Sequence, residues 1–220
     1  GLTIAVAGNP NAGKSTLINA IAGSRLHVGN WPGVTVEKKT ASLEYDVRDI
    51  SLVDLPGTYS LSPYTQEEVI ARDYLVKEKP DVIVNVVDAT NLERNLYFTL
   101  QLLELGIPLV IALNMTDEAA QKGFRIDADK IASILGCAVV PTIATKNEGL
   151  KHLMTTAVSF AVDPGAHAPG FVSYGEDIEQ ALAPIADALK DHPEVLAGRL
   201  PLRWFALKVL ERDERVLSEY

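Results

Sequence analysis

A glycine-rich stretch near the amino terminus constrains the fold more than any other part of the chain. It runs over Gly8–Ser15 and fits the pattern G-x-x-x-x-G-K-[ST]. Its two glycines allow the backbone to wrap closely around a polyphosphate, Lys14 can reach the outer phosphates, and the Ser15 hydroxyl can ligate magnesium. The motif requires a strand before it and a helix after it, and Leu2–Ala7 and Thr16–Ala22 have the corresponding patterns. The sequence therefore predicts a phosphate-binding loop that opens a helix.

Strand-length apolar runs alternate with helical patterns through most of the chain. This alternation implies right-handed crossovers, and hence an α/β fold with a mainly parallel sheet flanked by helices. The predicted strands are Leu2–Ala7, Thr40–Asp46, Arg48–Val53, Asp81–Val87, Pro108–Leu113 and Ala138–Thr142, and the predicted helices are Thr16–Ala22, Glu67–Lys77, Asn91–Leu105, Asp127–Leu135 and Gly149–Phe160. Glycine and proline punctuate Gly23–Gly33, which is predicted to be a loop.

The carboxyl-terminal part of the chain has a different pattern. Residues 161–170 contain two Pro-Gly pairs and are predicted to form a linker. Beyond them apolar residues recur at helical spacing, and Pro193 and Pro201 divide this part into separate helices. We predict an α/β domain over residues 1–162 and a small all-α domain over residues 170–220. The second should pack against the first, because it has little core of its own.

Composition excludes several classes of function. The net charge of −9, with no run of Lys or Arg, argues against a nucleic-acid-binding surface. The single cysteine, Cys137, lies in an apolar run, so we expect a buried core thiol and a reducing, cytosolic setting. No apolar stretch reaches the roughly 18 residues of a membrane-spanning helix, and no signal peptide is visible. The histidines are too scattered to predict a transition-metal site; they are His27, His152, His167 and His192.

Two polar residues after a predicted strand point to the base of the bound nucleotide. Asp117 can accept hydrogen bonds from the N1–H and 2-amino groups of guanine, whereas adenine would leave this carboxylate unpaired. Asn114 precedes it in the pattern N-x-x-D, and Met115 stands where a lysine is usual. The thioether chain of Met115 can cover the base as the lysine stem does. On its own this pattern is a common helix start, but after a phosphate-binding loop it predicts guanine-nucleotide binding.

Two further segments are expected to hold magnesium and the γ-phosphate. Asp54 and Gly57 form a D-x-x-G element after a predicted strand. Asp54 would hold magnesium through a water molecule, and the Gly57 N–H would bond the γ-phosphate, whose loss would free the following loop. Thr35 falls where a first switch loop should lie, and its hydroxyl is the expected further magnesium ligand.

One more loop is expected to contact the base. Pro141–Thr145 occupies the place of the S-A-x loop, whose backbone N–H meets guanine O6. Ile143 replaces the serine of that pattern, so we assign the contact to the Ala144 N–H.

These elements in this order resemble the translation-factor-type branch of bacterial GTPases, and more narrowly the cytosolic G domain of the ferrous iron transport protein B (FeoB) family. The matching strings are VGNWPGVTVEK over Val28–Lys38, DLPGTYSLSP over Asp54–Pro63 and NMTD over Asn114–Asp117. The first is the most specific, because GTPases in general do not require Trp-Pro-Gly there. The helical tail resembles that family's second cytosolic domain, which is described as slowing nucleotide release.

In that family a multi-helix membrane permease follows. The resemblance therefore implies that this chain is the soluble amino-terminal part of a ferrous iron transporter, at the cytoplasmic face of the bacterial inner membrane. It leaves the formation of a homo-oligomer open, and no residue of the chain itself predicts an iron site.

The resemblance also implies GTP hydrolysis stimulated by potassium. Many small GTPases carry glutamine directly after D-x-x-G, but Thr58 stands here, so slow intrinsic turnover is expected. Potassium, held partly by Asn11, would substitute for an arginine finger. Glu67 and Glu68 are expected to be solvated helix-start residues.

The expected roles can be collected by group. The catalytic residues are Asn11, Lys14, Thr35 and Gly57; the magnesium ligands are Ser15, Thr35 and Asp54; the potassium ligand is Asn11. The residues expected to contact GTP or GDP are Gly8, Asn9, Pro10, Asn11, Ala12, Gly13, Lys14, Ser15, Thr16, Gly33, Val34, Thr35, Asp54, Gly57, Asn114, Met115, Asp117, Ile143, Ala144 and Thr145. Two alternatives stay open: an Era/Der-like GTPase of ribosome assembly, against which the acidic charge counts, and a GTP/GDP sensor with negligible turnover.

Overall fold

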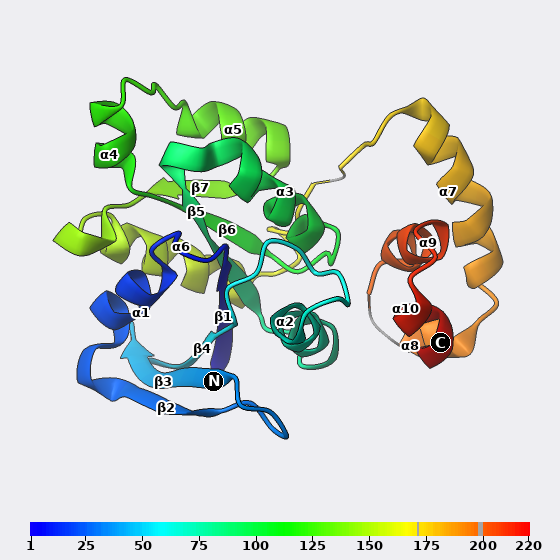
Figure 1. The fold of residues 1–220 in the computed structure, drawn as a ribbon, viewed down its shortest axis with the longest axis horizontal. Helices are drawn as coiled ribbons and strands as arrows, with labels where there is room; N and C mark the ends of the chain where they lie inside the picture. Colours follow the sequence, from blue (N-terminus) through cyan, green and yellow to red (C-terminus); the bar gives the residue numbers. More distant parts are fainter. Residues whose placement is uncertain (171, 198–199) are drawn as a thin grey trace.

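A seven-stranded sheet forms the centre of the computed structural model, which describes residues 1–170, 172–197 and 200–220 (Figure 1). The strands are β1 (Leu2–Gly8), β2 (Leu26–Asn30), β3 (Glu37–Tyr45), β4 (Arg48–Asp54), β5 (Val82–Asp88), β6 (Leu109–Asn114) and β7 (Ala138–Pro141). Their spatial order is β2-β3-β4-β1-β5-β6-β7. Strands β4, β1, β5, β6 and β7 are parallel, and β3 is antiparallel to both β2 and β4. The predicted mainly parallel sheet is confirmed.

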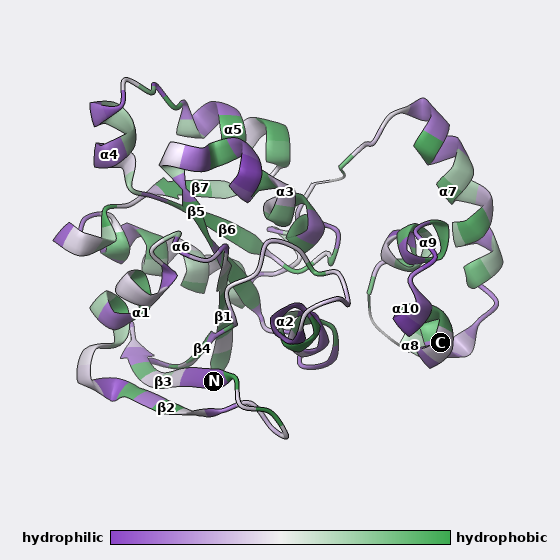
Figure 2. Ribbon diagram, viewed as in Figure 1, coloured by the Kyte–Doolittle hydropathy of each residue, from purple (hydrophilic) through white to green (hydrophobic). Residues whose placement is uncertain are grey.

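Helices cover both faces of this sheet, because side chains alternate along each strand. Ile4 and Val6 of β1 face the cluster built with α1 and α6, whereas Ala5 and Ala7 face the cluster built with α2, α3 and α5. The helices are α1 (Lys14–Ala22), α2 (Gln66–Lys77), α3 (Leu92–Leu103), α4 (Thr116–Gln121), α5 (Ala128–Leu135) and α6 (Leu150–Val162). Figure 2 shows β5 and β6 as mainly apolar, as expected of strands covered on both sides.

The predicted loop over Gly23–Gly33 is wrong in part. A 3₁₀ turn occupies Gly23–Arg25, and β2 follows it at the edge of the sheet. Four of the five β2 residues are exposed, so the strand carries no buried apolar alternation and forms through backbone pairing with β3. The short helix α4 also has no counterpart in the predictions, because six residues are too few to show a helical period.

The carboxyl-terminal helices form a separate lobe in Figure 1. They are α7 (Glu176–Leu189), α8 (Pro193–Ala197), α9 (Leu202–Leu210) and α10 (Glu214–Glu219). Leu182 and Leu207 belong to a small core of their own, whereas Trp204 and Phe205 belong to the same core as Leu75 of α2. The lobe therefore packs against the α/β part as predicted. The predicted range 170–220 includes residues 171, 198 and 199, which lie outside the described residues.

Three ion pairs tie α2 to this lobe. The Arg72 guanidinium donates to Asp213 at 2.7 Å, and the two side chains are only 4% and 6% exposed. Asp73 pairs with Arg215, and Lys77 approaches Glu219 at 3.4 Å, both nearer to solvent. A buried pair needs both partners, since removal of one leaves an uncompensated charge. The lobe is therefore fixed to α2 by charge as well as by apolar contact.

Two further predictions concern single features. Cys137 is buried, as predicted, and burial raises the pKa of its thiol to about 12. Among the helices of residues 1–170, 172–197 and 200–220, none is long and apolar enough to cross a bilayer.

Candidate guanine-nucleotide site

The loop from β1 to α1 is closely surrounded by the ends of other strands. A Cβ at Gly13 would lie 2.2 Å from Asn114 Nδ2, and a Cβ at Gly8 would lie 2.8 Å from the Val86 carbonyl oxygen. Gly13 also has a φ of 91°, in the left-handed region that glycine tolerates best. Asn11, at the exposed side of the loop, has a φ of 66°. Both glycines of the motif are thus required by close packing and, at Gly13, by backbone conformation.

Asp54 and Lys14 meet beside this loop. β4 ends at Asp54, and the Lys14 ammonium donates to its carboxylate. Both side chains are about nine-tenths buried. Burial raises the pKa of Asp54, while the charge and hydrogen bond of Lys14 oppose this rise. The structure thus brings together the two residues expected at the phosphates and at magnesium.

The D-x-x-G element is attached to the phosphate-binding loop. A Cβ at Gly57 would lie 3.4 Å from Pro10 Cα, and the Thr58 N–H donates to the Gly8 carbonyl at 3.2 Å. Two oxygens nearby, Asn9 Oδ1 and Thr58 Oγ1, are buried and have no hydrogen-bond partner among the described residues. Close-fitting glycines, a buried lysine, a carboxylate and unpaired oxygens are a donor set that suits a polyphosphate and a hard cation.

A small cavity of about 40 Å³ lies next to the loop, and most of the residues expected at the base line it. The cavity is lined by Gly13, Thr16, Asn114, Met115, Asp117, Glu118, Ile143, Ala144 and Thr145, of which only Glu118 was not expected to contact the nucleotide. They come from the start of α1, the end of β6, the first turn of α4 and the turn after β7. Parallel strands end at one edge of the sheet, so residues distant in sequence converge there.

Asn114 connects three of these segments. Its Nδ2 donates to the Ala12 carbonyl at 3.1 Å, and its Oδ1 accepts from the Ala144 N–H at 3.1 Å and from the Thr142 hydroxyl at 3.2 Å. The Ala144 N–H was expected to contact guanine O6. In the structure it donates to Asn114 instead. The next residue, Thr145, lines the same cavity.

Lys146 is a site residue that the sequence did not single out. Its ammonium donates to Asp117 Oδ2 at 2.8 Å, close to the cavity. This hydrogen bond is the main cause that holds the pKa of Asp117 below its usual value. The signal was weak, since a single lysine in a polar turn has no pattern that a spacing argument can use.

The loop between β2 and β3 lies away from the phosphate-binding loop. Thr35 is exposed, and Figure 1 shows this loop, which also carries Gly33 and Val34, well apart from the end of β1. Trp31 anchors it against α2: its ring is 7% exposed and makes an edge contact with Tyr74 at 5.5 Å between centroids. The Lys38 ammonium lies 4.6 Å from the centroid of the Trp31 ring. Of the expected magnesium ligands, the structure gathers Asp54 near the loop that carries Ser15 and leaves Thr35 outside.

The acidic residues at the start of α2 have a structural role. The Thr65 side chain accepts from the Glu68 N–H, and Glu68 accepts from the Thr65 N–H, which is a capping box. Glu68 also accepts from the Ser60 hydroxyl at 2.6 Å, and Glu67 is exposed. Neither here nor in the rest of the described chain do three His, Cys, Asp or Glu side chains lie close enough together to hold a metal ion.

Comparisons with known proteins agree with this geometry. Residues 2–157 match the family model described as ferrous iron transport protein B, and residues 174–220 match the FeoB cytosolic helical domain. Among curated relatives, an Fe(2+) transport protein A/Fe(2+) transporter FeoB fusion protein of Porphyromonas gingivalis is 43% identical over 98% of this chain and 26% of that protein. The Fe(2+) transporter FeoB of Escherichia coli K12 is 43% identical over 96% of this chain and 27% of that protein. The chain thus spans about a quarter of the length of these relatives.

Solved structures give the same result. The cytosolic domain of T. maritima FeoB in its apo form is 38% identical with a TM-score of 0.91, over 99% of this chain and 84% of that one. Its GMPPNP form is 37% identical with a TM-score of 0.90, over 100% of this chain and 84% of that one. The cytosolic domain of L. pneumophila FeoB is 38% identical with a TM-score of 0.85, over 99% and 84%. The chain belongs to the ferrous iron transport protein B family and comprises its G domain and its cytosolic helical domain.

Proposed function

We propose that this chain binds and hydrolyses GTP, and that the change from GTP to GDP controls ferrous iron uptake through a membrane permease. One observation carries the nucleotide part of the proposal. The cavity at Asn114 and Asp117 adjoins the phosphate-binding loop, which in turn adjoins Asp54 and Gly57. A base pocket and a polyphosphate cradle are therefore continuous at one edge of the sheet. Titration of the chain with GDP and ADP tests this, and equal affinity for the two would contradict it.

The phosphate end would work through the loop and Lys14. The Gly8–Ser15 backbone would hold the phosphates, and Lys14 would turn from Asp54 to the β- and γ-phosphates. Ser15 and Asp54 would then hold magnesium, an ion that neutralises charge on the β- and γ-phosphate oxygens when bound. Gly57 would donate its N–H to the γ-phosphate, so the segment after it would respond to the presence of that phosphate.

The base end would work through Asp117. Its carboxylate would accept from guanine, and Met115 would cover one face of the ring. The hydrogen bond from Lys146 lowers the pKa of Asp117 and so favours its charged form, which is the form that accepts both hydrogen bonds. Because the Ala144 N–H is bonded to Asn114, we assign the contact with O6 to the backbone of Thr145.

Hydrolysis is expected to depend on potassium. Thr58 is buried and bonded through its N–H to Gly8, so the position that often carries glutamine offers no long side chain to orient water. Asn11 is exposed in the phosphate-binding loop, where its amide oxygen can bind a monovalent cation. Such an ion supplies positive charge near the leaving phosphate oxygens when bound.

Single-turnover hydrolysis should be about tenfold or more faster in KCl than in NaCl, as expected for a fixed charge beside the developing anion. Asn11→Ala should remove this difference and leave GDP affinity nearly unchanged. Asn19→Ala is a matched control, because Asn19 is an exposed asparagine at the far end of the following helix α1. Equal and negligible rates in both salts would favour a GTP/GDP sensor instead.

Thr35→Ala tests the role of the β2–β3 loop. Because Thr35 lies outside the site in this structure, it should act only when the loop closes over GTP. We expect hydrolysis to fall by about a hundredfold, as for removal of one group that contacts the reacting phosphate, with GDP affinity almost unchanged. Stopped-flow binding of fluorescent GDP and single-turnover assays measure the two quantities. An equal loss of both would count against a switch role.

The transporter part of the proposal depends on family membership. We propose a G domain over residues 1–162, a linker over 161–170 and a helical domain over 170–220 that slows nucleotide release. The partner would be a permease portion of the same polypeptide, which places the chain at the cytoplasmic face of the inner membrane. Fusing the chain to its permease and measuring iron(II) uptake with GTP and with a non-hydrolysable analogue tests this part separately.

A further inference from the structure

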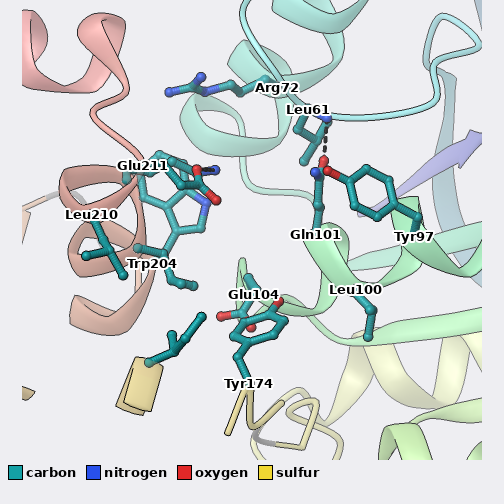
Figure 3. A pocket seen from close by; sticks show the side chains of 13 residues that line it. Leu61, Arg72, Tyr97, Leu100, Gln101, Glu104, Tyr174, Trp204, Leu210 and Glu211 are labelled. Atoms are coloured by element: carbon teal, nitrogen blue, oxygen red, sulfur yellow. Dashed lines mark hydrogen bonds and ion pairs between the residues drawn. The ribbon is translucent and has the colours of Figure 1, made fainter. Parts of the chain in front are cut away.

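A second cavity lies at the junction between the α/β part and the helical lobe (Figure 3). Its volume is about 240 Å³, and its lining comes from α2, α3, α9, the start of α7 and the segment after Gly57. Its lining includes Leu61, Leu100, Gln101, Glu104, Ile178 and Trp204. None of them belongs to the nucleotide site described above.

The side chains that line the cavity suit an aromatic ligand. Figure 3 shows Trp204 on the α9 side and Leu100 and Gln101 on the α3 side of the cavity. Leu61 closes one end, and Gln101 Oε1 accepts from its N–H at 2.6 Å. A dry cavity of about 150 Å³ is enough to bind benzene. The larger space here can take a two-ring aromatic group.

Among the described residues that line the cavity, Glu104 has a buried side-chain oxygen without a hydrogen-bond partner. Its side chain is only 8% exposed, and this oxygen is Oε1. Its nearest cation is Arg203, at 3.5 Å from Oε2, but this guanidinium also makes two hydrogen bonds to Glu179, at 2.5 and 2.9 Å. Burial raises the pKa of Glu104, against the opposing effects of a hydrogen bond with Tyr174 and of the Arg203 charge.

The other charges around the cavity are balanced in pairs. Arg72 pairs with Asp213, and Lys208 pairs with Glu211 at 2.8 Å. Arg203 serves both Glu104 and Glu179, so the cluster has one negative charge in excess when Glu104 is ionised, which is the form that a cationic ligand would favour. An anionic ligand would therefore be repelled, and a ligand with a cationic hydrogen-bond donor would find an acceptor at Glu104.

We propose that this cavity binds a small aromatic amine, with its ammonium group beside the Glu104 carboxylate and its ring system between Trp204 and Leu100. Such a ligand would contact both parts of the chain at once. It would also touch Leu61, which belongs to the segment that follows Gly57. The site is independent of the nucleotide pocket and does not depend on the function proposed above.

The test compares three probes of the same shape and different charge. Calorimetry or ¹H–¹⁵N NMR on the 220-residue chain with GDP bound should show tryptamine binding about tenfold more tightly than indole, because a charge-assisted hydrogen bond is added. Indole-3-acetate should bind more weakly than either. Equal affinity for tryptamine and indole-3-acetate, or no binding of tryptamine at millimolar concentration, would overturn the proposal.

Two variants locate the site. Glu104→Gln should lower tryptamine affinity to that of indole. Glu93→Gln, the same change at an exposed position of α3 that does not line the cavity, should leave it unchanged. Because Glu104 also contacts Arg203, Ile178→Trp is a second variant that fills the cavity and keeps the carboxylate; it should abolish binding of both tryptamine and indole. Thermal unfolding and circular dichroism check that each variant is folded. Undiminished tryptamine binding by a folded Ile178→Trp variant would place the ligand elsewhere.

Discussion

Asp117→Asn is expected to reverse the base preference of this chain, with the affinity for GDP falling by about a hundredfold or more and XDP becoming the better ligand. In the proposed site the Asp117 carboxylate would accept from two guanine donors, whereas an asparagine amide presents one acceptor and one donor, which suits the second carbonyl of xanthine. A site built to hydrogen-bond its ligand rejects an analogue with a mismatched group by several orders of magnitude. Competition of GDP and XDP against a fluorescent nucleotide measures the change.

Glu118→Gln is the matched control for this experiment. Glu118 is the next residue, lines the same cavity and is exposed, so its variant removes the same charge without a contact to the base. Its preference for GDP should be unchanged. The Asp117–Lys146 pair is open to solvent, so neither variant should unfold at a different temperature. If Asp117→Asn keeps its preference for guanine, the base lies elsewhere and the nucleotide site proposed here is wrong.

Arg72→Met is expected to destabilise the chain by about 3–5 kcal/mol, because Asp213 would keep a buried charge without its partner. Methionine retains most of the apolar stem of Arg72, which limits the loss of packing. Urea unfolding followed by tryptophan fluorescence measures the change, since Trp204 lies beside this pair, with Arg72 Cζ 5.7 Å from the centroid of its ring.

Arg215→Met provides the comparison. Its pair with Asp73 has side chains that are 37% and 29% exposed, and such a pair contributes about 1 kcal/mol or less. Equal effects of the two variants would mean that Arg72 and Asp213 are better solvated than their positions indicate. A double variant, Arg72→Met with Asp213→Leu, should recover part of the loss, because it leaves no unpaired charge.

The pair also predicts how stability depends on pH. Burial alone would raise the pKa of Asp213, but hydrogen bonds from Arg72 and from the Val216 N–H outweigh it and hold this pKa below 3.8. A carboxyl group whose pKa is lowered by folding contributes stability above its unfolded pKa and loses it as the pH falls through its folded value. The difference between wild type and Arg72→Met should therefore be full at neutral pH and shrink below about pH 4.

The parts of the fold that could be predicted are those with a strong local pattern. The phosphate-binding loop could be predicted because its glycines, Lys14 and Ser15 follow one another at a fixed spacing within eight residues. The central strands could be predicted because burial on both faces demands continuous apolar runs. β2 was missed because an exposed edge strand is held by backbone pairing, which leaves no trace in its side chains. The same limit applies to α4, which is a single short helix.

The candidate site divides in the same way. Residue types and spacing placed Asp117 and Met115 at the base cavity, since the ends of parallel strands must meet. The sequence could not predict that the Ala144 N–H donates to Asn114, because this bond depends on how the turn after β7 lies against the end of β6. Lys146 was missed for a similar reason, since its pairing with Asp117 joins two loops that are distant in sequence. Position relative to a neighbouring loop is a tertiary property, and no local pattern records it.

The anchoring of Trp31 on α2 has a consequence for the energy of switching. Thr35 can reach the phosphates only if its loop leaves α2, and the indole would then lose its contact with Tyr74 and become wet. Exposing a large aromatic side chain costs about 3 kcal/mol, so the γ-phosphate must offset that amount before the loop can close. Tyr74 lies on α2, the helix that also carries Arg72, and the Arg72 guanidinium pairs with Asp213 of the helical lobe. In the proposed switch, the contact of Trp31 with α2 would favour the open position of the loop, and the γ-phosphate would favour the closed one.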